Sequence, residues 1–153
     1  AVFTLFYFSF MQSLTANDAF EKYHDWSTLP AFQTKSETVN SLPRARAFFN
    51  EEKYSDALRL FTFYSNSNPY NPNVALYIGV CQLELQEYSE ALKTFAILQS
   101  SDAVDNHKAY WYTALVYLKL DDATAAKKIL QQLVQDSNNY NYQKAKELLK
   151  KLE

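Results

Sequence analysis

Two nine-residue stretches of this chain repeat one pattern: KYSDALRLF at Lys53–Phe61 and EYSEALKTF at Glu87–Phe95. They begin 34 residues apart and share the Tyr-Ser pair, the Ala-Leu pair and the final Phe, with Asp and Glu exchanged between them. A weaker third copy, DATAAKKIL, begins at Asp122. Self-similarity at a period of roughly 20 to 50 residues is the signature of stacked repeats, so the repeat is the first evidence on the fold.

Small residues recur within each copy and again upstream of it. The downstream set is Ala57, Ala91 and Ala126, and the upstream set is Ala45, Gly79 and Ala114. Small side chains allow two helices to approach closely, and the large residues Phe61, Phe95 and Leu130 fill the space beside them. Each unit is therefore predicted to be a helix hairpin that buries its apolar face only against its neighbours.

Composition agrees with a helical protein. The 153 residues include one glycine and four prolines, with 48% hydrophobic and 21% charged residues. So few glycines disfavour a turn-rich β-fold or a phosphate-binding loop. The formal net charge of −2 gives no electrostatic reason to expect a nucleic-acid partner.

Local signals give the helix boundaries. Asn71 followed by Pro72 is typical of an N-cap with proline in the first turn. The predicted helices are Ser41–Asn50, Ser55–Ser65, Pro72–Gln86, Ser89–Gln99, Val104–Leu120, Asp122–Asp136 and Tyr140–Leu152. The last has an apolar face (Tyr142, Ala145, Leu148, Leu149 and Leu152) and lysines elsewhere, which is the pattern of a terminal capping helix.

The first fourteen residues, AVFTLFYFSFMQSL, are mostly apolar. The run is shorter than the ~20 residues that span a bilayer, and it lacks the charged start of a signal peptide. Three interpretations stay open: the end of a membrane helix, the remnant of a secretory signal, or a segment that packs on this chain's own groove or on a partner. A helix would place Phe3, Phe6, Tyr7 and Phe10 on one face, as an anchor or interface.

After this run, Asn17–Trp26 is predicted to be a short amphipathic helix with Phe20 and Tyr23 directed inward and Trp26 as a further candidate for that face. The stretch Ser27–Asn40 is predicted to be a polar loop.

With these positions in place, residues Thr38–Asp136 resemble the tetratricopeptide repeat family. The resemblance is carried by LYIGVCQLELQEYSEALKTF (Leu76–Phe95), by YWYTALVYLKLDDATAAKKIL (Tyr110–Leu130) and by Pro69. The family's common Gly-Asp or Gly-Asn turn is replaced by Glu52-Lys53, Gln86-Glu87 and Asp121-Asp122. The sequence WYTALVYLKL, followed by a leucine-rich last helix, is also similar to small repeat proteins of Bacteroidetes. This second resemblance suggests a location in the cell envelope over a cytoplasmic one.

The resemblance implies an all-α fold, an α-solenoid of three helix hairpins with a C-terminal capping helix. The expected division places an N-terminal segment at 1–37 and the repeat domain at 38–153. Within the latter, the repeats are expected at 38–71, 72–105 and 106–138 and the capping helix at 139–153.

By the family's geometry, the first helix of each hairpin lines a concave, mostly apolar groove for a protein or peptide partner. The expected lining residues are Leu42, Arg46, Phe49, Asn73, Leu76, Val80, Leu83, Lys108, Trp111, Leu115 and Leu118. Leu76, Leu83, Trp111 and Leu118 are expected to be accessible unless the chain's own N-terminal segment covers them. At the positions where some family members grip a C-terminal carboxylate, only Lys108 fits, so that type of clamp is not expected.

Catalytic and metal sites are not predicted. His24 and His107 have no metal-ligand spacing, and Cys81 lies in an apolar helix, where a buried thiol is the expectation. No motif for nucleotide binding, metalloprotease activity or serine hydrolysis is present. The prediction is therefore a non-enzymatic scaffold or adaptor without a cofactor. The alternative is a membrane-anchored structural subunit of a cell-envelope complex, and the oligomeric state stays open.

Overall fold

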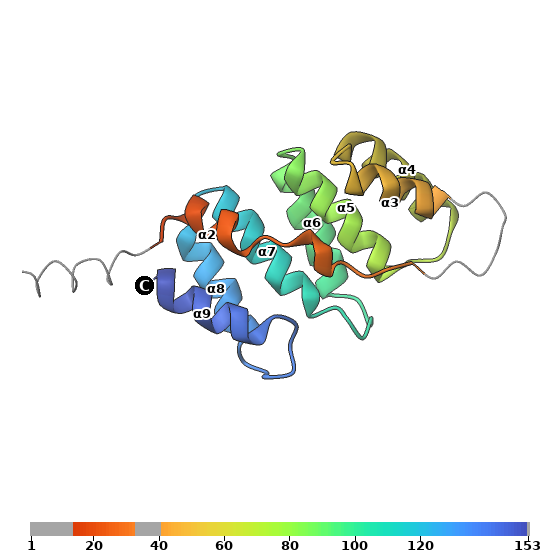
Figure 1. The fold of residues 1–153 in the computed structure, drawn as a ribbon. Helices are drawn as coiled ribbons and strands as arrows, with labels where there is room; N and C mark the ends of the chain where they lie inside the picture. Colours follow the sequence, from red (N-terminus) through yellow and green to blue (C-terminus); the bar gives the residue numbers. More distant parts are fainter. Residues whose placement is uncertain (1–13, 33–40, 153) are drawn as a thin grey trace, which may run out of the picture.

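Three helix hairpins follow one another along the chain in the computed structural model, which describes residues 14–32 and 41–152 (Figure 1). The first pairs α3 (Ser41–Asn50) with α4 (Tyr54–Ser67), and the second pairs α5 (Pro72–Glu84) with α6 (Tyr88–Gln99). The third pairs α7 (Lys108–Lys119) with α8 (Ala123–Leu133), and α9 (Tyr142–Leu152) packs on α8. No strand occurs within the described ranges, so the predicted all-α solenoid is confirmed.

The three turns within the hairpins have the same geometry. Glu52, Gln86 and Asp121 have positive φ angles of 59°, 62° and 57°. The next residue's amide donates back to the preceding helix in each case, from Lys53 to the Phe48 carbonyl at 2.9 Å in the first hairpin. This is the Schellman motif, which satisfies carbonyls at a helix end and usually places glycine at the left-handed position. The family's turn glycine is thus replaced without any change of the turn.

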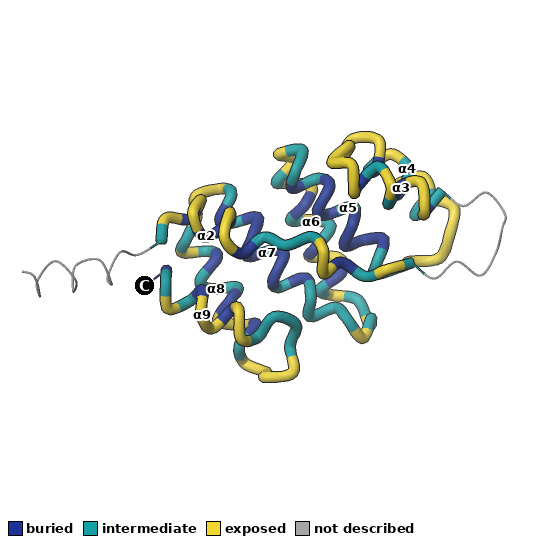
Figure 2. The backbone as a smooth tube through the Cα atoms, in the orientation of Figure 1, coloured by how far each residue is buried: buried dark blue, intermediate teal, exposed yellow. Residues whose placement is uncertain are grey.

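The small residues lie where the helices of a hairpin meet. Ala45, Ala57, Ala91, Ala114 and Ala126 are each fully buried. Gly79 of α5 lies against the ring of Phe95 of α6. Buried residues lie in the hairpin interiors, while the turns within the three hairpins are mostly exposed (Figure 2). The alternation of small and large residues therefore sets the distance between paired helices.

Most predicted helix boundaries agree with the structure to within three residues. The helix Ser41–Asn50 is confirmed, and Asn71 caps α5 by accepting from the amides of Asn73 and Val74 at 3.0 and 3.3 Å. The predicted start at Val104 is wrong, because α7 begins at Lys108. The preceding residues form turns, and the Asn106 side-chain amide donates to the Ser101 carbonyl at 2.9 Å. Such local hydrogen bonds compete with helix formation.

The capping helix is confirmed as amphipathic, since Ala145, Leu148 and Leu152 are buried and Lys150 is exposed. At the other end of the chain, α2 (Ala16–Tyr23) packs on α7 and α9, and a single 3-10 turn, η1 (Trp26–Thr28), follows it. Phe20 and Tyr23 are buried, as predicted.

The predicted anchor residues Phe3, Phe6, Tyr7 and Phe10 lie outside the described residues. Among the helices within residues 14–32 and 41–152, none has the length and apolar character needed to cross a bilayer. The proposed domain boundaries stay a prediction.

Candidate functional site

The eleven residues predicted to line a groove come from the first helix of each hairpin, and we call them the α3/α5/α7 face. Eight are buried: Leu42, Phe49, Leu76, Val80, Leu83, Trp111, Leu115 and Leu118. Arg46, Asn73 and Lys108 are half-buried. The face is therefore not an open apolar groove. Leu76, Leu83, Trp111 and Leu118 are not accessible. Their accessibility was expected only if the chain's own N-terminal segment did not cover them.

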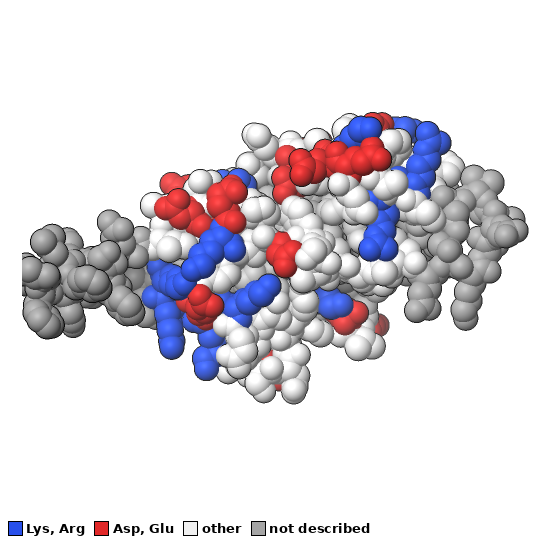
Figure 3. Space-filling model, viewed as in Figure 1, with Lys and Arg blue, Asp and Glu red and all other residues white. Residues whose placement is uncertain are grey.

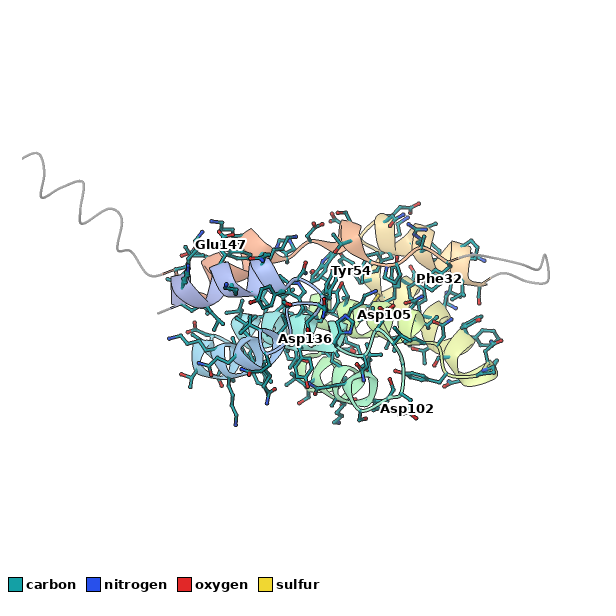
Figure 4. The ribbon with its side chains drawn as sticks, turned by 90° about the horizontal axis from the view of Figure 1, so that it is seen from below. Phe32, Tyr54, Asp102, Asp105, Asp136 and Glu147 are labelled. Atoms are coloured by element: carbon teal, nitrogen blue, oxygen red, sulfur yellow. The ribbon has the colours of Figure 1, made fainter. Side chains whose placement is uncertain are left out.

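The chain's own residues 14–32 lie along this face. In Figure 1 the segment runs in front of α7 and α5, two helices that are distant from it in the sequence. Seen from below, α6 and α8 lie on the other side of the α5 and α7 layer from the segment (Figure 4). It consists of two parts, the helix α2 and the stretch of residues 24–32, which includes η1 and which we call the crossing segment.

Trp26 holds the middle of the crossing segment. Its ring stacks on Tyr112 of α7, with centroids 6.2 Å apart and an interplanar angle of 29°. Its Nε1–H donates to the carboxylate of Glu84 at the end of α5, with a distance of 2.7 Å to Oε1. A charged acceptor makes this a stronger bond than one between neutral groups, and it fixes the direction of the indole.

Pro30 and Phe32 hold the end of the crossing segment. The Tyr77 hydroxyl of α5 donates to the Pro30 carbonyl at 3.1 Å. The Phe32 ring lies 5.1 Å from the Tyr77 ring and 5.9 Å from the Phe61 ring, measured between centroids. Aromatic pairs at these separations add to the free energy of burial. The middle and the end of the segment therefore each contact a tyrosine of the repeat stack, Tyr112 and Tyr77.

Helix α2 is attached more firmly than the crossing segment. Tyr23 packs edge-on against Trp111 at 6.4 Å and donates its hydroxyl to Glu147 of α9 at 2.8 Å. The Lys119 ammonium lies 4.1 Å from the Phe20 ring centroid and donates to Glu21 at 2.9 Å. Trp111, expected as a groove anchor, is thus packed beneath the chain's own helix.

Three residues that hold the crossing segment were not among the eleven predicted groove-lining residues: Tyr77, Tyr112 and Glu84. The prediction of a polar loop from Ser27 also needs correction, because Leu29 is buried and Phe32 is packed on the core. The signal that could have found this contact is the apolar sequence LPAF, Leu29–Phe32, inside an otherwise polar stretch.

On α3 the described residues leave a hollow beside Phe32. This hollow, of about 290 Å³, is lined by Phe32, Pro43, Arg46, Ala47 and Asn50. Arg46 lies at its inner edge near Tyr77: burial raises the pKa of the Tyr77 phenol, and the nearby guanidinium partly opposes that rise. The part of the face on α3 thus combines an apolar floor with a cation and an amide.

A second hollow, of about 470 Å³, lies where α5 begins beside the turns that precede α7. Asn73 lines it, and within the described part of the chain its buried Oδ1 has no hydrogen-bond partner. Lys108, the cation predicted at this end of the groove, pairs with Asp105 at 3.1 Å. Lys108 is therefore a neutralised cation rather than a carboxylate receptor.

The groups that could support catalysis are placed for packing. Burial raises the pKa of the Cys81 thiol, which opposes formation of a nucleophilic thiolate. His24 stacks flat on Phe20 at 4.8 Å. Across residues 14–32 and 41–152, no three or more metal-ligating side chains are grouped. The charges of both signs are interspersed on the face shown in Figure 3, with no continuous basic surface that would favour nucleic acid.

Comparison with known families supports the prediction of helical repeats. The family model described as Tetratricopeptide repeat matches residues 74–102 and 108–139, which cover the second and third hairpins. The first hairpin, α3–α4, lies outside the matched residues but has the same turn geometry at Glu52. No curated protein and no solved structure matches the chain.

Proposed function

We propose, on the premise that residues 74–102 and 108–139 are tetratricopeptide repeats, that this protein is a scaffold that binds a segment of a partner protein along the α3/α5/α7 face. Such repeats mediate contacts between proteins, and each stacked hairpin adds a section to one continuous surface. The proposed binding residues are Tyr77, Tyr112 and Glu84, which hold the crossing segment, together with the half-buried members of the predicted set, Arg46, Asn73 and Lys108.

One observation carries the proposal: the face already holds an extended peptide, the chain's own crossing segment. The contacts of Trp26 and Phe32 have the chemistry of peptide recognition, with aromatic anchors in pockets and a few hydrogen bonds that set direction. The hollow beside Phe32 and Arg46 offers a partner a contact site on α3.

Nothing in the catalytic groups described above favours an enzyme, and the absence of enzymatic activity stays a prediction. The alternative of a membrane-anchored subunit depends on residues 1–13, which lie outside the described residues. The scaffold proposal does not depend on them.

Site-specific photocrosslinking tests the proposal in native extracts. A photoreactive amino acid is placed at Ala47 or Asn50, both exposed on α3 at the open hollow. The matched controls are Phe63 on α4 and Ile97 on α6, which are 64% and 60% exposed and occupy equivalent positions 34 residues apart. We expect partner adducts from the α3 positions and not from the controls. Adducts from Phe63 and Ile97 alone would move the binding surface to the second helices and overturn the proposal.

A further inference from the structure

We propose that the crossing segment, residues 24–32, is a resident competitor. The face it occupies binds partner peptides of the same chemistry, a stretch with two aromatic residues six positions apart and a proline between them. This inference rests on the proposed function and adds the class of ligand and the way access to it is controlled.

The contacts divide residues 14–32 into a fixed part and a weakly held part. Four residues of α2 are buried: Ala16, Ala19, Phe20 and Tyr23. In the crossing segment only Leu29 is buried, while Ser27, Thr28 and Ala31 are exposed. Regions with few buried apolar contacts open at lower free energy than the global fold. The crossing segment can therefore leave the face while α2 stays attached.

The contacts that hold the crossing segment also indicate that it can leave the face. Its described contacts with α5, α7 and α9 run through side chains, apart from the Pro30 carbonyl that accepts from Tyr77. Thr28 and Tyr140 share a hydroxyl hydrogen bond of 2.7 Å, and Asp25 approaches Lys144 only to 3.9 Å. No backbone ladder fixes the segment to the stack, so another peptide with suitably spaced side chains makes equivalent contacts.

The sites on the face define the ligand. The Tyr112 ring and the Glu84 carboxylate together select an aromatic ring that carries a hydrogen-bond donor, which is tryptophan in the crossing segment. The Tyr77 hydroxyl selects a free backbone carbonyl, and Pro30 provides one in a conformation that is already extended. The Tyr77 and Phe61 rings select a second aromatic residue at the position of Phe32.

Competition has a measurable consequence. A resident segment that fills the site most of the time leaves only a fraction of the molecules open. The apparent affinity for an added peptide is the intrinsic affinity multiplied by that open fraction. Weakening the resident segment should therefore tighten binding of the added peptide, although the face itself is unchanged.

The probe is a fluorescently labelled peptide of residues 24–32, HDWSTLPAF, titrated against the full chain and followed by anisotropy. The variants are Trp26→Ala/Phe32→Ala, Phe32→Ala alone, and Phe63→Ala as the matched control on an exposed aromatic residue away from the site. We expect the double variant to bind the probe about tenfold or more tightly than the parent, because truncating an aromatic anchor typically costs about that much in affinity. Phe32→Ala should be intermediate, and Phe63→Ala should match the parent.

A second peptide, with serine in place of both aromatic residues, should bind none of the proteins. Circular dichroism verifies that each variant is folded. If the double variant is not folded, the comparison of Phe32→Ala with the parent decides. Phe32 lies at the end of the segment and is only partly buried, so its truncation should leave the fold intact. Equal binding to folded parent and variants, no binding to the folded variants, or equal binding of the serine peptide would overturn the inference. Partner adducts at Ala47 and Asn50 would still leave the scaffold function standing, so the two failures are distinguishable.

Discussion

The ring of Phe95 occupies the space that a side chain on Gly79 would need. A Cβ built on Gly79 would lie 2.5 Å from Cζ and 3.0 Å from Cδ1 of that ring. Both residues are in the hairpin interior, with Phe95 fully buried. The one glycine of the chain is therefore required by the approach of α5 to α6, not by backbone conformation.

Gly79→Leu should destabilise the fold by roughly 1–3 kcal/mol or more, because overpacking forces the ring and the backbone to move. Urea denaturation followed by circular dichroism measures the loss. Ala96→Leu is the control, since Ala96 is next to Phe95 on α6 but exposed, and it should change the free energy of unfolding little. A parent-like midpoint for Gly79→Leu would mean that the α5–α6 contact is wrongly described.

Gln86→Gly should stabilise the chain. Gln86 has a φ of 62°, a left-handed conformation that costs a residue with a Cβ about 1 kcal/mol or more, part of which is offset by the larger unfolded-state entropy of glycine. We expect a net gain of about 0.5–1 kcal/mol, with the same direction for Glu52→Gly and Asp121→Gly. The midpoint of urea unfolding, at an unchanged slope, is the measurement. Gln86→Ala keeps a Cβ and should show no gain; equal stabilisation by alanine would contradict the turn explanation.

Trp111→Ala should act as a core truncation. Trp111 is 2% exposed and packs beneath Tyr23, so we expect a loss of about 3–5 kcal/mol in the free energy of unfolding. Trp26→Ala, in the half-buried crossing segment, should cost less. Chemical denaturation of the two variants side by side checks the order. If Trp111→Ala were as stable as the parent, the face would be open in solution, as the sequence alone had suggested.

Alkaline pH should weaken the fold through buried tyrosines. Burial raises the pKa of Tyr54 from the usual 10.0 to about 12, and Glu84 and Glu52 add to the rise. The folded chain therefore holds this phenolic proton more tightly than the unfolded chain. Its stabilising contribution is complete below about pH 10 and is lost as the pH rises through about 12.

The measurement is the urea midpoint at pH 9 and at intervals up to about pH 12. Tyr54→Phe removes the titrating group and should reduce the loss of stability over this range. Tyr142→Phe, which removes a hydroxyl from another half-buried tyrosine, is the control. An identical pH dependence in the parent and in Tyr54→Phe would exclude Tyr54 as a contributor.

The repeat architecture followed from the sequence because its determinants are local and periodic. Ala57, Ala91 and Ala126 recur at a fixed spacing, and an Asn71-Pro72 start or a buried Phe95 needs only nearby residues to be recognised. The same physics explains one error: the start of α7 was misplaced because side-chain hydrogen bonds around Asn106 compete with a helix, and periodicity does not report them.

The state of the candidate site was decided by tertiary structure alone. The sequence predicted the eleven residues of the α3/α5/α7 face as one set on the first helices, but a residue's helical position does not say what lies over it. Trp26 reaches Glu84 across 58 positions and Tyr23 reaches Glu147 across 124. Contacts at such separations leave no periodic trace in a single sequence. Only the folded chain, with α2 anchored on α7 and α9, brings the crossing segment onto Tyr77, Glu84 and Tyr112.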